Sequence, residues 1–195
     1  EKGLVKAVGV SNYGIDATRA CSEALSKRGM KLATNQIQLS LLYRWPLENG
    51  LMETCSDLGV KVLAYSPLAL GMLTGKYTPE NKPSGPRKQI YNELIKTPDY
   101  TDLLATMDGI AKSHDGANKA QVALNWARAK GSIPIPGART VSQVKSNYAA
   151  LDWSLTKEDE KKLDAAASKV TTFIKPNASP FPKKDKNTGL VMFDS

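Results

Sequence analysis

The stretch "VKVLAYSPLALGMLTGKY" (residues 60–77) joins a short apolar run to a loop rich in glycine and hydroxyl side chains. Its beginning, VKVLAY, is mostly apolar and rich in valine, so it predicts a buried strand. The loop continues through Pro79, Pro83 and Pro86, which makes it too long for a simple connection between a strand and a helix. Long loops on a rigid scaffold often carry function, so this segment is the first candidate for a binding site.

Similar apolar runs recur along the chain, and a helical pattern follows each of them. Strands are expected at 4–10, 32–38, 60–65 and 132–137, and helices at 15–29, 46–59, 99–114, 119–131 and after Thr140 and Thr156. Strands and helices in this strict order form a parallel sheet with helices outside it. The fold class is therefore α/β, either a small doubly wound sheet or part of a (β/α)₈ barrel.

Capping residues mark several of the expected helix ends. Asp16 is placed to cap the first helix and Gly29 to end it, and Thr140 with Gln143 forms a capping box. The helix after that box has one apolar stripe, made of Val141, Val144, Tyr148 and Leu151.

The composition is that of a soluble globular protein, with 41% apolar and 24% charged residues. Apolar stretches end well short of the roughly 18 residues of a membrane span, so no transmembrane helix is predicted. Cys21 and Cys55 lack CxxC spacing and the lone His114 lies at a polar helix end, so no metal site is predicted. The net charge of +8 fits nucleic-acid binding, but the lysines are scattered and no aromatic–basic motif accompanies them. Neither nucleic acid nor a membrane is expected as a partner.

A set of polar or small residues follows the expected strands where each strand ends. They are Ser11 and Asn12, Gln36 and Gln38, Tyr65 and Ser66, and Gly137 with Arg139. In both candidate folds ligands bind at the carboxyl ends of the strands, so these residues predict a binding rim. Because the rim has no carboxylate, histidine or cysteine, it indicates binding without an acid–base group.

The loop after the third strand does not match the common phosphate-binding motifs. "GMLTGKY" has one residue too few between its glycines for a Walker A loop, and Tyr77 replaces the Ser or Thr of that motif. The GxGxxG fingerprint of dinucleotide-binding folds is absent as well. From this segment alone, a solvated surface loop with a lysine is an equal alternative.

Five segments follow one another along the chain: "VGVSNY", "NQIQLSLLYR", "AYSPLALGMLTGKY", "ALNWARAKGSIPIPGART" and "NYAALDWSLT". As an ordered set they identify a protein family more specifically than any one segment does. Together they resemble the second half of an aldo-keto reductase, and the loop resembles plant and algal plastid members of that family, including the pyridoxal reductase type. The resemblance implies that residues 1–167 form the C-terminal half of a TIM barrel, strands five to eight with their helices. Residues 168–195 would be a tail. A plastid location follows by resemblance, with the cytoplasm as the alternative.

The resemblance also implies NADPH as cofactor and a role for the rim residues. Ser11, Asn12 and Gln36 would hydrogen-bond the nicotinamide carboxamide, and Tyr65 would stack under the nicotinamide ring.

The remaining residues would hold the rest of the cofactor. The loop over the pyrophosphate would contain Ser66, Leu68, Gly71, Leu73 and Lys76. The adenosine end would contain Gly137, Arg139, Gln143 and Asn147, with Arg139 on the 2′-phosphate. Leu70 and Ser146 depart from the family pattern, in which Gln and Glu are frequent at these positions.

The family's catalytic tetrad of Asp, Tyr, Lys and His belongs to earlier strands, which this chain does not contain, so no catalytic residue is assigned. In that tetrad the Tyr protonates the carbonyl oxygen as hydride reaches the carbon. The resemblance implies NADPH-dependent reduction of an aldehyde or ketone to an alcohol. This chain would supply the NADPH-binding half, inactive alone, and its partner would be the N-terminal half of the same barrel. The alternative is a non-catalytic NADPH-binding regulatory subunit.

A half barrel would expose apolar side chains that the other half covers. From the sequence, the side chains expected on that inner face are Val8, Val10, Ile37, Val62 and Ile135.

Overall fold

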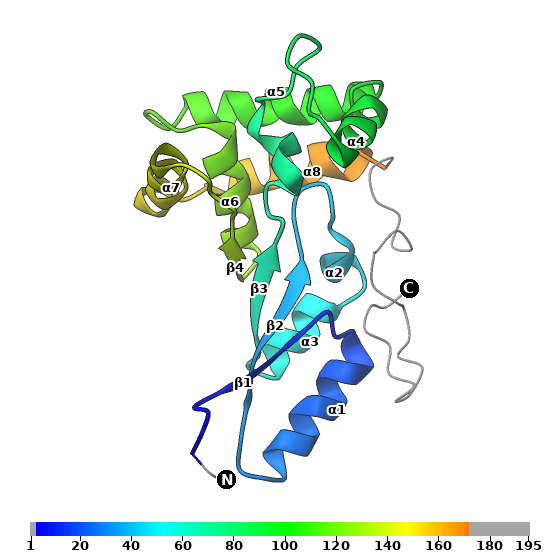
Figure 1. Ribbon diagram of the computed structural model, residues 1–195, viewed down its shortest axis with the longest axis vertical. Coiled ribbons are helices and arrows are strands. Elements are labelled where there is room, and N and C mark those ends of the chain that lie inside the picture. The colour runs from blue at the N-terminus through cyan, green and yellow to red at the C-terminus, as the bar shows by residue number, and fades with distance from the viewer. Residues whose placement is uncertain (1–2, 172–195) are drawn as a thin grey trace.

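A four-stranded parallel sheet organises the chain, and the computed structural model describes residues 3–171 of it (Figure 1). The strands are β1 (Val8–Ser11), β2 (Leu32–Gln38), β3 (Lys61–Tyr65) and β4 (Ser132–Ile135). Each strand pairs with the next one in the chain, in the order β1-β2-β3-β4. The predicted parallel α/β fold is confirmed, and this order does not reverse within the described chain as it would in a doubly wound sheet.

The helices follow the strands largely as the sequence predicts. They are α1 (Ile15–Ser26), α2 (Trp45–Glu48), α3 (Leu51–Asp57), α4 (Pro86–Leu94), α5 (Pro98–Lys112), α6 (Lys119–Ala129), α7 (Val141–Tyr148) and α8 (Lys157–Lys169), with 3₁₀ helices η1 (Ala69–Thr74) and η2 (Ala149–Asp152).

Several boundaries differ from the prediction for local reasons. The cap of α1 is Gly14, so Asp16 lies in the first turn, where its charge still complements the helix dipole. The helix expected at 46–59 is divided at Gly50, whose φ of 86° is left-handed. The long loop predicted after β3 contains α4, which the sequence did not predict. This helix begins at Pro86, and proline is well suited to the first helical position.

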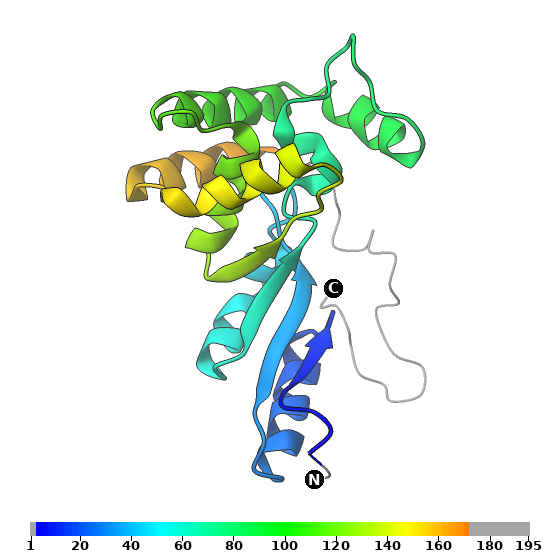
Figure 2. The ribbon, with the colours of Figure 1, turned by 60° about the vertical axis from the view of Figure 1, so that its left-hand side comes forward.

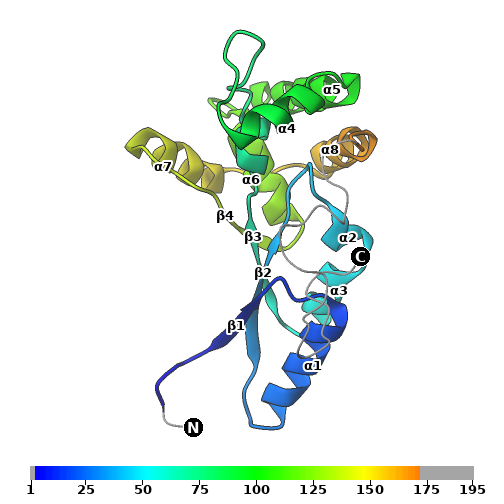
Figure 3. The same ribbon diagram turned by 45° about the vertical axis from the view of Figure 1, so that its right-hand side comes forward.

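One face of the sheet is covered by helices. In Figure 3, α1 and α3 lie on the same side of β1–β3, and α1 packs on β2 while α3 packs on β3. The core between them contains Leu32, Ile37, Leu51, Cys55, Val60 and Val62. Figure 2 shows a second layer above the sheet, where α5, α6 and α8 enclose a core around the fully buried Trp126.

The other face of the sheet is only partly covered by the described chain. Ile133 and Ile135 of β4 are 52% and 40% exposed, whereas Ile37 and Val62 are buried against the helices. The expectation that Ile37 and Val62 lie on the inner face is therefore wrong, and Val10 also packs toward the helices. Side chains alternate along a strand, and the alternation places the polar Thr34, Gln36 and Gln38 on the open face instead.

The apolar stripe of α7 and η2 lies at the surface of the described chain. Val141, Val144, Tyr148 and Leu151 are 54% to 72% exposed. The spacing of the stripe is as predicted, but no core within residues 3–171 receives it.

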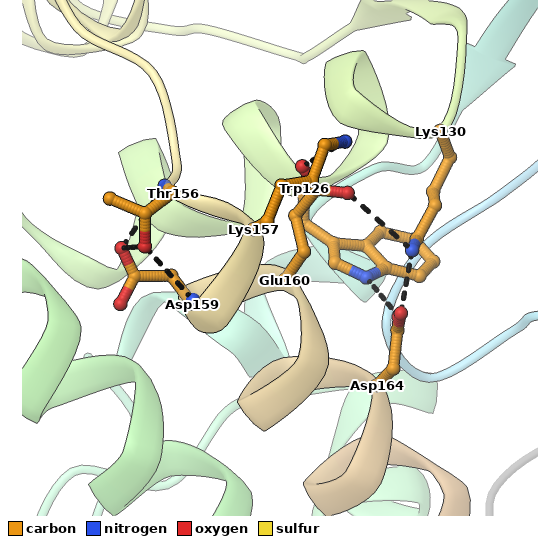
Figure 4. Close-up of polar contacts among 7 residues, drawn as sticks. All are labelled: Trp126, Lys130, Thr156, Lys157, Asp159, Glu160 and Asp164. Atoms are coloured by element: carbon orange, nitrogen blue, oxygen red, sulfur yellow. Dashed lines mark hydrogen bonds and ion pairs between the residues drawn. The ribbon is translucent and has the colours of Figure 1, made fainter.

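Polar contacts fasten α8 to the rest of the upper layer (Figure 4). The indole of Trp126 and the ammonium of Lys130 both bind Asp164, at 2.8 Å and 2.6 Å. At its start, α8 has the predicted cap: the Thr156 hydroxyl accepts from the amide of Asp159 at 3.1 Å, and the Asp159 carboxylate accepts from Thr156. The helix continues to Lys169, and the tail expected from residue 168 otherwise falls in 172–195, outside the described residues.

The two cysteines and the one histidine of the sequence all lie within residues 3–171. Cys55 is buried, Cys21 is half-buried and both thiols are free. His114 stacks on the ring of Trp153. Within this part of the chain no cluster of His, Cys, Asp and Glu could hold a metal, and no helix is long and apolar enough to cross a bilayer.

Candidate cofactor-binding site

Strand register brings the predicted nicotinamide residues to one end of the sheet. Ser11 of β1 lies beside Gln36 of β2, and Gln38 lies beside Tyr65, which in turn neighbours Ile135 of β4. The Ser11 hydroxyl donates to the backbone carbonyl of Gln36 at 3.0 Å. Residues from four separate strands thus meet at the carboxyl ends, as the parallel topology requires.

Asn12 is the residue at this end that most clearly lacks a partner. It follows β1 in a left-handed conformation, with a φ of 58°, and its backbone N–H donates to the Gln36 carbonyl at 2.9 Å. The side chain is buried, and its Oδ1 has no hydrogen-bond partner in the described chain. A buried, unpaired amide oxygen is costly unless a donor meets it, so this position suits a ligand that carries an N–H group.

Tyr65 presents a ring at the end of β3 with its hydroxyl turned into the protein. That hydroxyl is buried without a hydrogen-bond partner in residues 3–171. Burial, together with the neighbouring Tyr43, raises the pKa of Tyr65 to about 12, so the phenol stays protonated at neutral pH. The flat ring fits a role as a stacking platform, and the raised pKa gives it no role as a base.

A cleft of about 750 Å³ continues from this point toward α7. Its walls come from the loop after β3, the start of α4, the start of α6 and the loop and helix after β4. The residues that line it include Ser66, Leu68, Leu70, Gly71, Thr74, Lys76, Arg87, Asn118, Gly137, Arg139, Ser142, Gln143, Ser146 and Asn147.

The charges of the cleft all have the same sign. Lys76, Arg87 and Arg139 line it, and none of the described residues that line it is acidic. The first turns of α6 and α7 also border it, and helix N-termini carry partial positive charge. A concave surface with these properties attracts an anion, and its volume of about 750 Å³ exceeds what a single phosphate needs.

The loop that forms one wall has an unusual backbone. Ser66, Ala69 and Leu70 have positive φ values of 51°, 47° and 57°, a region that costs energy for residues other than glycine. Gly71 follows with a φ of 93°, and the Thr74 hydroxyl donates to its carbonyl at 2.8 Å. Backbone strain of this kind is concentrated at functional sites, so it supports a binding role for the loop.

The opposite wall is ordered by Gln143. Its side-chain oxygen accepts from the backbone N–H of Arg139 at 2.7 Å, and its own N–H donates to Thr140 at 3.2 Å. The predicted capping box is therefore modified: Thr140 caps α7, but Gln143 reaches back one residue further than expected. This contact fixes the loop from which the Arg139 side chain extends.

Asn118 and Ser146 tie α6 to α7 at the floor of the cleft. The Asn118 amide donates to the Ser146 hydroxyl at 2.9 Å, and Gln121 donates to the Ser146 carbonyl at 3.0 Å. Ser146 thus has a structural partner at the position where the family often has Glu.

The structure brings most of the predicted site residues to the cleft and leaves others beside it. Ser66, Leu68, Gly71, Lys76, Gly137, Arg139, Gln143 and Asn147 line the cleft. Ser11, Asn12, Gln36 and Tyr65 lie at the adjoining strand ends. Leu73 is the exception: its side chain is fully buried in the core, and its N–H donates to the Leu68 carbonyl at 3.3 Å.

Arg87 and Asn118 are cleft residues that the sequence reasoning missed. Arg87 follows Pro86 at the start of α4, and a proline at that position was a readable sign of a helix start. Asn118 begins a capping box with Gln121, another local signal. Neither signal tells that the two helix starts converge on one cleft, because that depends on the packing of distant segments.

The described residues thus form a parallel α/β fold with a cationic cleft at the carboxyl ends of its strands. The sequence profile of the Aldo/keto reductase family matches residues 1–168, and the chain belongs to that family.

Curated relatives extend this result. The chain is 42% identical over 167 residues to the chloroplastic pyridoxal reductase of Arabidopsis thaliana, covering 86% of this chain and 45% of that protein. It is 29% identical over 160 residues to the L-glyceraldehyde 3-phosphate reductase of Escherichia coli O157:H7, covering 78% of this chain and 46% of that protein.

Among solved structures, the chain resembles the thermostable aldo-keto reductase Tm1743 crystallised with the inhibitor epalrestat. The TM-score is 0.64 at 29% identity, over 85% of this chain and 50% of that one. The chain thus spans about half the length of the relatives that it matches.

Proposed function

We propose that the cleft binds the pyrophosphate and adenosine of NADPH, with the nicotinamide at the ends of β1–β3. The observation that carries this proposal is the charge of the cleft: among residues 3–171, Lys76, Arg87 and Arg139 line it and no carboxylate does. Such a surface suits a ligand with several phosphates. The unpaired oxygen of Asn12 supports the nicotinamide end, because the carboxamide offers an N–H donor.

We further propose that the chain is the C-terminal half of a (β/α)₈ barrel whose other half carries the catalytic tetrad. The half-length match to full reductases supports this. The exposed Ile133 and Ile135 on the open sheet face support it too, as does the exposed stripe of α7. Further strands and helices of the same barrel would bury these surfaces.

The function that follows is NADPH-dependent reduction of an aldehyde or ketone to an alcohol. When bound, NADPH supplies the hydride. Ser11, Asn12 and Gln36 would hold the carboxamide and so fix which face of the ring meets the substrate, while Tyr65 supports the opposite face. Proton delivery to the carbonyl oxygen would come from the other half of the barrel. The name of the Arabidopsis relative suggests a plastid location for the whole protein.

Replacing Arg139 by Ala tests the cofactor assignment. If its guanidinium meets the 2′-phosphate, NADP⁺ should bind about ten- to a hundredfold more weakly, since a charge-assisted contact is worth roughly 1.5–3 kcal/mol. NAD⁺, which lacks that phosphate, should bind the variant and the unaltered chain equally. Lys145→Ala is a matched control, because Lys145 is an exposed cation on α7 outside the cleft lining. Equal losses for both nucleotides would reject the assignment.

A second test separates the reductase from a non-catalytic NADPH-binding subunit. The chain should not oxidise NADPH with an aldehyde panel when alone, and should do so once it is expressed with the remainder of its barrel. A complete barrel that binds NADPH but reduces no carbonyl would favour the regulatory alternative.

A further inference from the structure

The side chain of Lys76 occupies a defined notch in the wall of the cleft. Its Nζ lies 4.6 Å from the centroid of the Tyr77 ring. On the other side is Gly71: a Cβ there would come within 3.1 Å of Nζ and 3.0 Å of Cε. The ammonium therefore lies between an aromatic face and a backbone position kept free of a side chain.

The backbone of Lys76 is fixed as well. Its N–H donates to the Thr74 hydroxyl at 3.3 Å, and its carbonyl accepts from the Asn81 amide at 2.7 Å. Thr78 and Asn81 exchange backbone hydrogen bonds of 3.2 Å and 3.1 Å, which close the next turn of the loop. A lysine at the surface usually samples many rotamers. The rotamers of Lys76 are restricted, because both its backbone and the end of its side chain have contacts.

The ring of Tyr77 is held in place by a buried tyrosine of the core. Its ring meets the fully buried Tyr91 of α4 edge-on, with centroids 6.2 Å apart. Tyr77 is half-buried and packs against the upper core, and it is not one of the residues that line the cleft. The ring thus connects the core to a cation of the cleft.

No carboxylate within residues 3–171 forms an ion pair with Lys76, so its charge is left for a ligand. We propose that Tyr77 is a positioning residue, which holds the Lys76 ammonium at the cleft by a cation–π contact and so strengthens binding of the cofactor phosphates. This inference rests on the proposed function of the cleft.

Titration calorimetry with NADP⁺ tests the inference on the chain expressed with the remainder of its barrel. Tyr77→Leu removes the ring face and should weaken binding about two- to fivefold, the range of a solvent-exposed cation–π contact. Tyr77→Phe keeps the face and should bind as the unaltered chain does. Because Tyr77 acts through Lys76, adding Tyr77→Leu to Lys76→Met should cause no further loss.

The outcomes separate this inference from the function on which it rests. If the complete barrel with the unaltered chain binds no NADP⁺, the cofactor assignment fails and the role of Tyr77 fails with it. If NADP⁺ binds and Tyr77→Leu leaves the affinity unchanged, only the positioning role is overturned. The positioning role would also be overturned if Tyr77→Leu lowered the NADP⁺ affinity equally in the unaltered and the Lys76→Met backgrounds. Such a result would indicate a general packing defect, which does not depend on the lysine.

Discussion

The indole Nε1 of Trp126 donates a 2.8 Å hydrogen bond to Oδ1 of Asp164, which joins the buried centre of α6 to α8. The other carboxylate oxygen of Asp164 binds the Lys130 ammonium at 2.6 Å (Figure 4). Because Ala120 of α6 and its N-cap Asn118 line the cleft, the contact that holds α6 against α8 also supports one wall of the candidate site.

Asp164→Ala should lower the free energy of unfolding by roughly 1–3 kcal/mol, because it leaves a buried indole N–H without an acceptor. Asp164→Asn keeps an acceptor oxygen and should cost less. Urea unfolding followed by tryptophan fluorescence measures both. Glu93→Ala, which breaks an exposed pair with Lys96, is the control and should cost less than about 1 kcal/mol. Equal losses for Asp164→Ala and Glu93→Ala would contradict the anchoring role.

Because of Asp159, the free energy of unfolding should depend on pH in the acid range. Burial raises the pKa of this carboxyl, but hydrogen bonds from Thr156 and contact with His114, 3.5 Å away, outweigh it and hold the pKa below its ordinary value. A depressed pKa stabilises the folded state above the unfolded value of about 3.9, and that contribution disappears as the pH falls through the folded pKa.

The Asp159→Asn variant tests this dependence. It should be less stable than the unaltered chain at pH 7 by about 1–2 kcal/mol, and the difference should vanish toward pH 2. Unfolding curves at a series of pH values measure the difference. A gap that stays constant from pH 7 to pH 2 would show that the Asp159 charge contributes nothing.

Gly9 permits the close approach of β1 and β2. A Cβ at this position would lie 2.3 Å from the Thr34 hydroxyl oxygen, so Gly9→Ala should lower the free energy of unfolding by roughly 1–3 kcal/mol. In a Thr34→Ala background the loss should be smaller, because the nearest remaining atom is the Thr34 carbonyl oxygen, 3.4 Å away. Gly109→Ala in α5 has no atom within 4 Å of the new Cβ and should be stabilising by comparison. An equal effect of Gly9→Ala in both backgrounds would reject the steric explanation.

The proposed role of Tyr65 can be tested with two ligands, of which only one carries a nicotinamide ring. Stacking on the nicotinamide predicts that Tyr65→Ala weakens NADP⁺ binding about fivefold, corresponding to roughly 1 kcal/mol. The same variant should bind 2′,5′-ADP normally, since that ligand has no nicotinamide. Tyr65→Phe keeps the ring and should bind both ligands normally. A similar loss for both ligands would indicate a packing defect of the cleft instead of a lost stack.

Much of the candidate site could be read from the sequence because its signals are local. A valine-rich run ended by Ser11 and Asn12 indicates a strand and its carboxyl end, and parallel order then groups the strand ends on one rim. The same reasoning placed Gly137 and Arg139 at the end of the last strand, and both line the cleft. Local hydrogen bonding likewise made the Thr156 cap readable.

Contacts between distant segments could not be read in this way. Ile37 and Val62 were expected on the inner face of the barrel, but the structure packs both on the helix side of the sheet. Leu73 belonged to a loop expected over the cofactor, but the packing of η1 turned it into the core. Arg87 was one cation among many until α4 placed it on the cleft.

The sequence by itself determined the order and type of the main elements and the chemistry of the strand ends, since hydrophobic period, caps and turn residues act over a few neighbours. Only the tertiary structure decided which face each strand side chain occupies and which loop residue reaches the core. It also decided which cations, namely Lys76, Arg87 and Arg139, converge on one cleft. These outcomes depend on strand register and helix packing between residues far apart in the chain, and no short stretch of sequence specifies either.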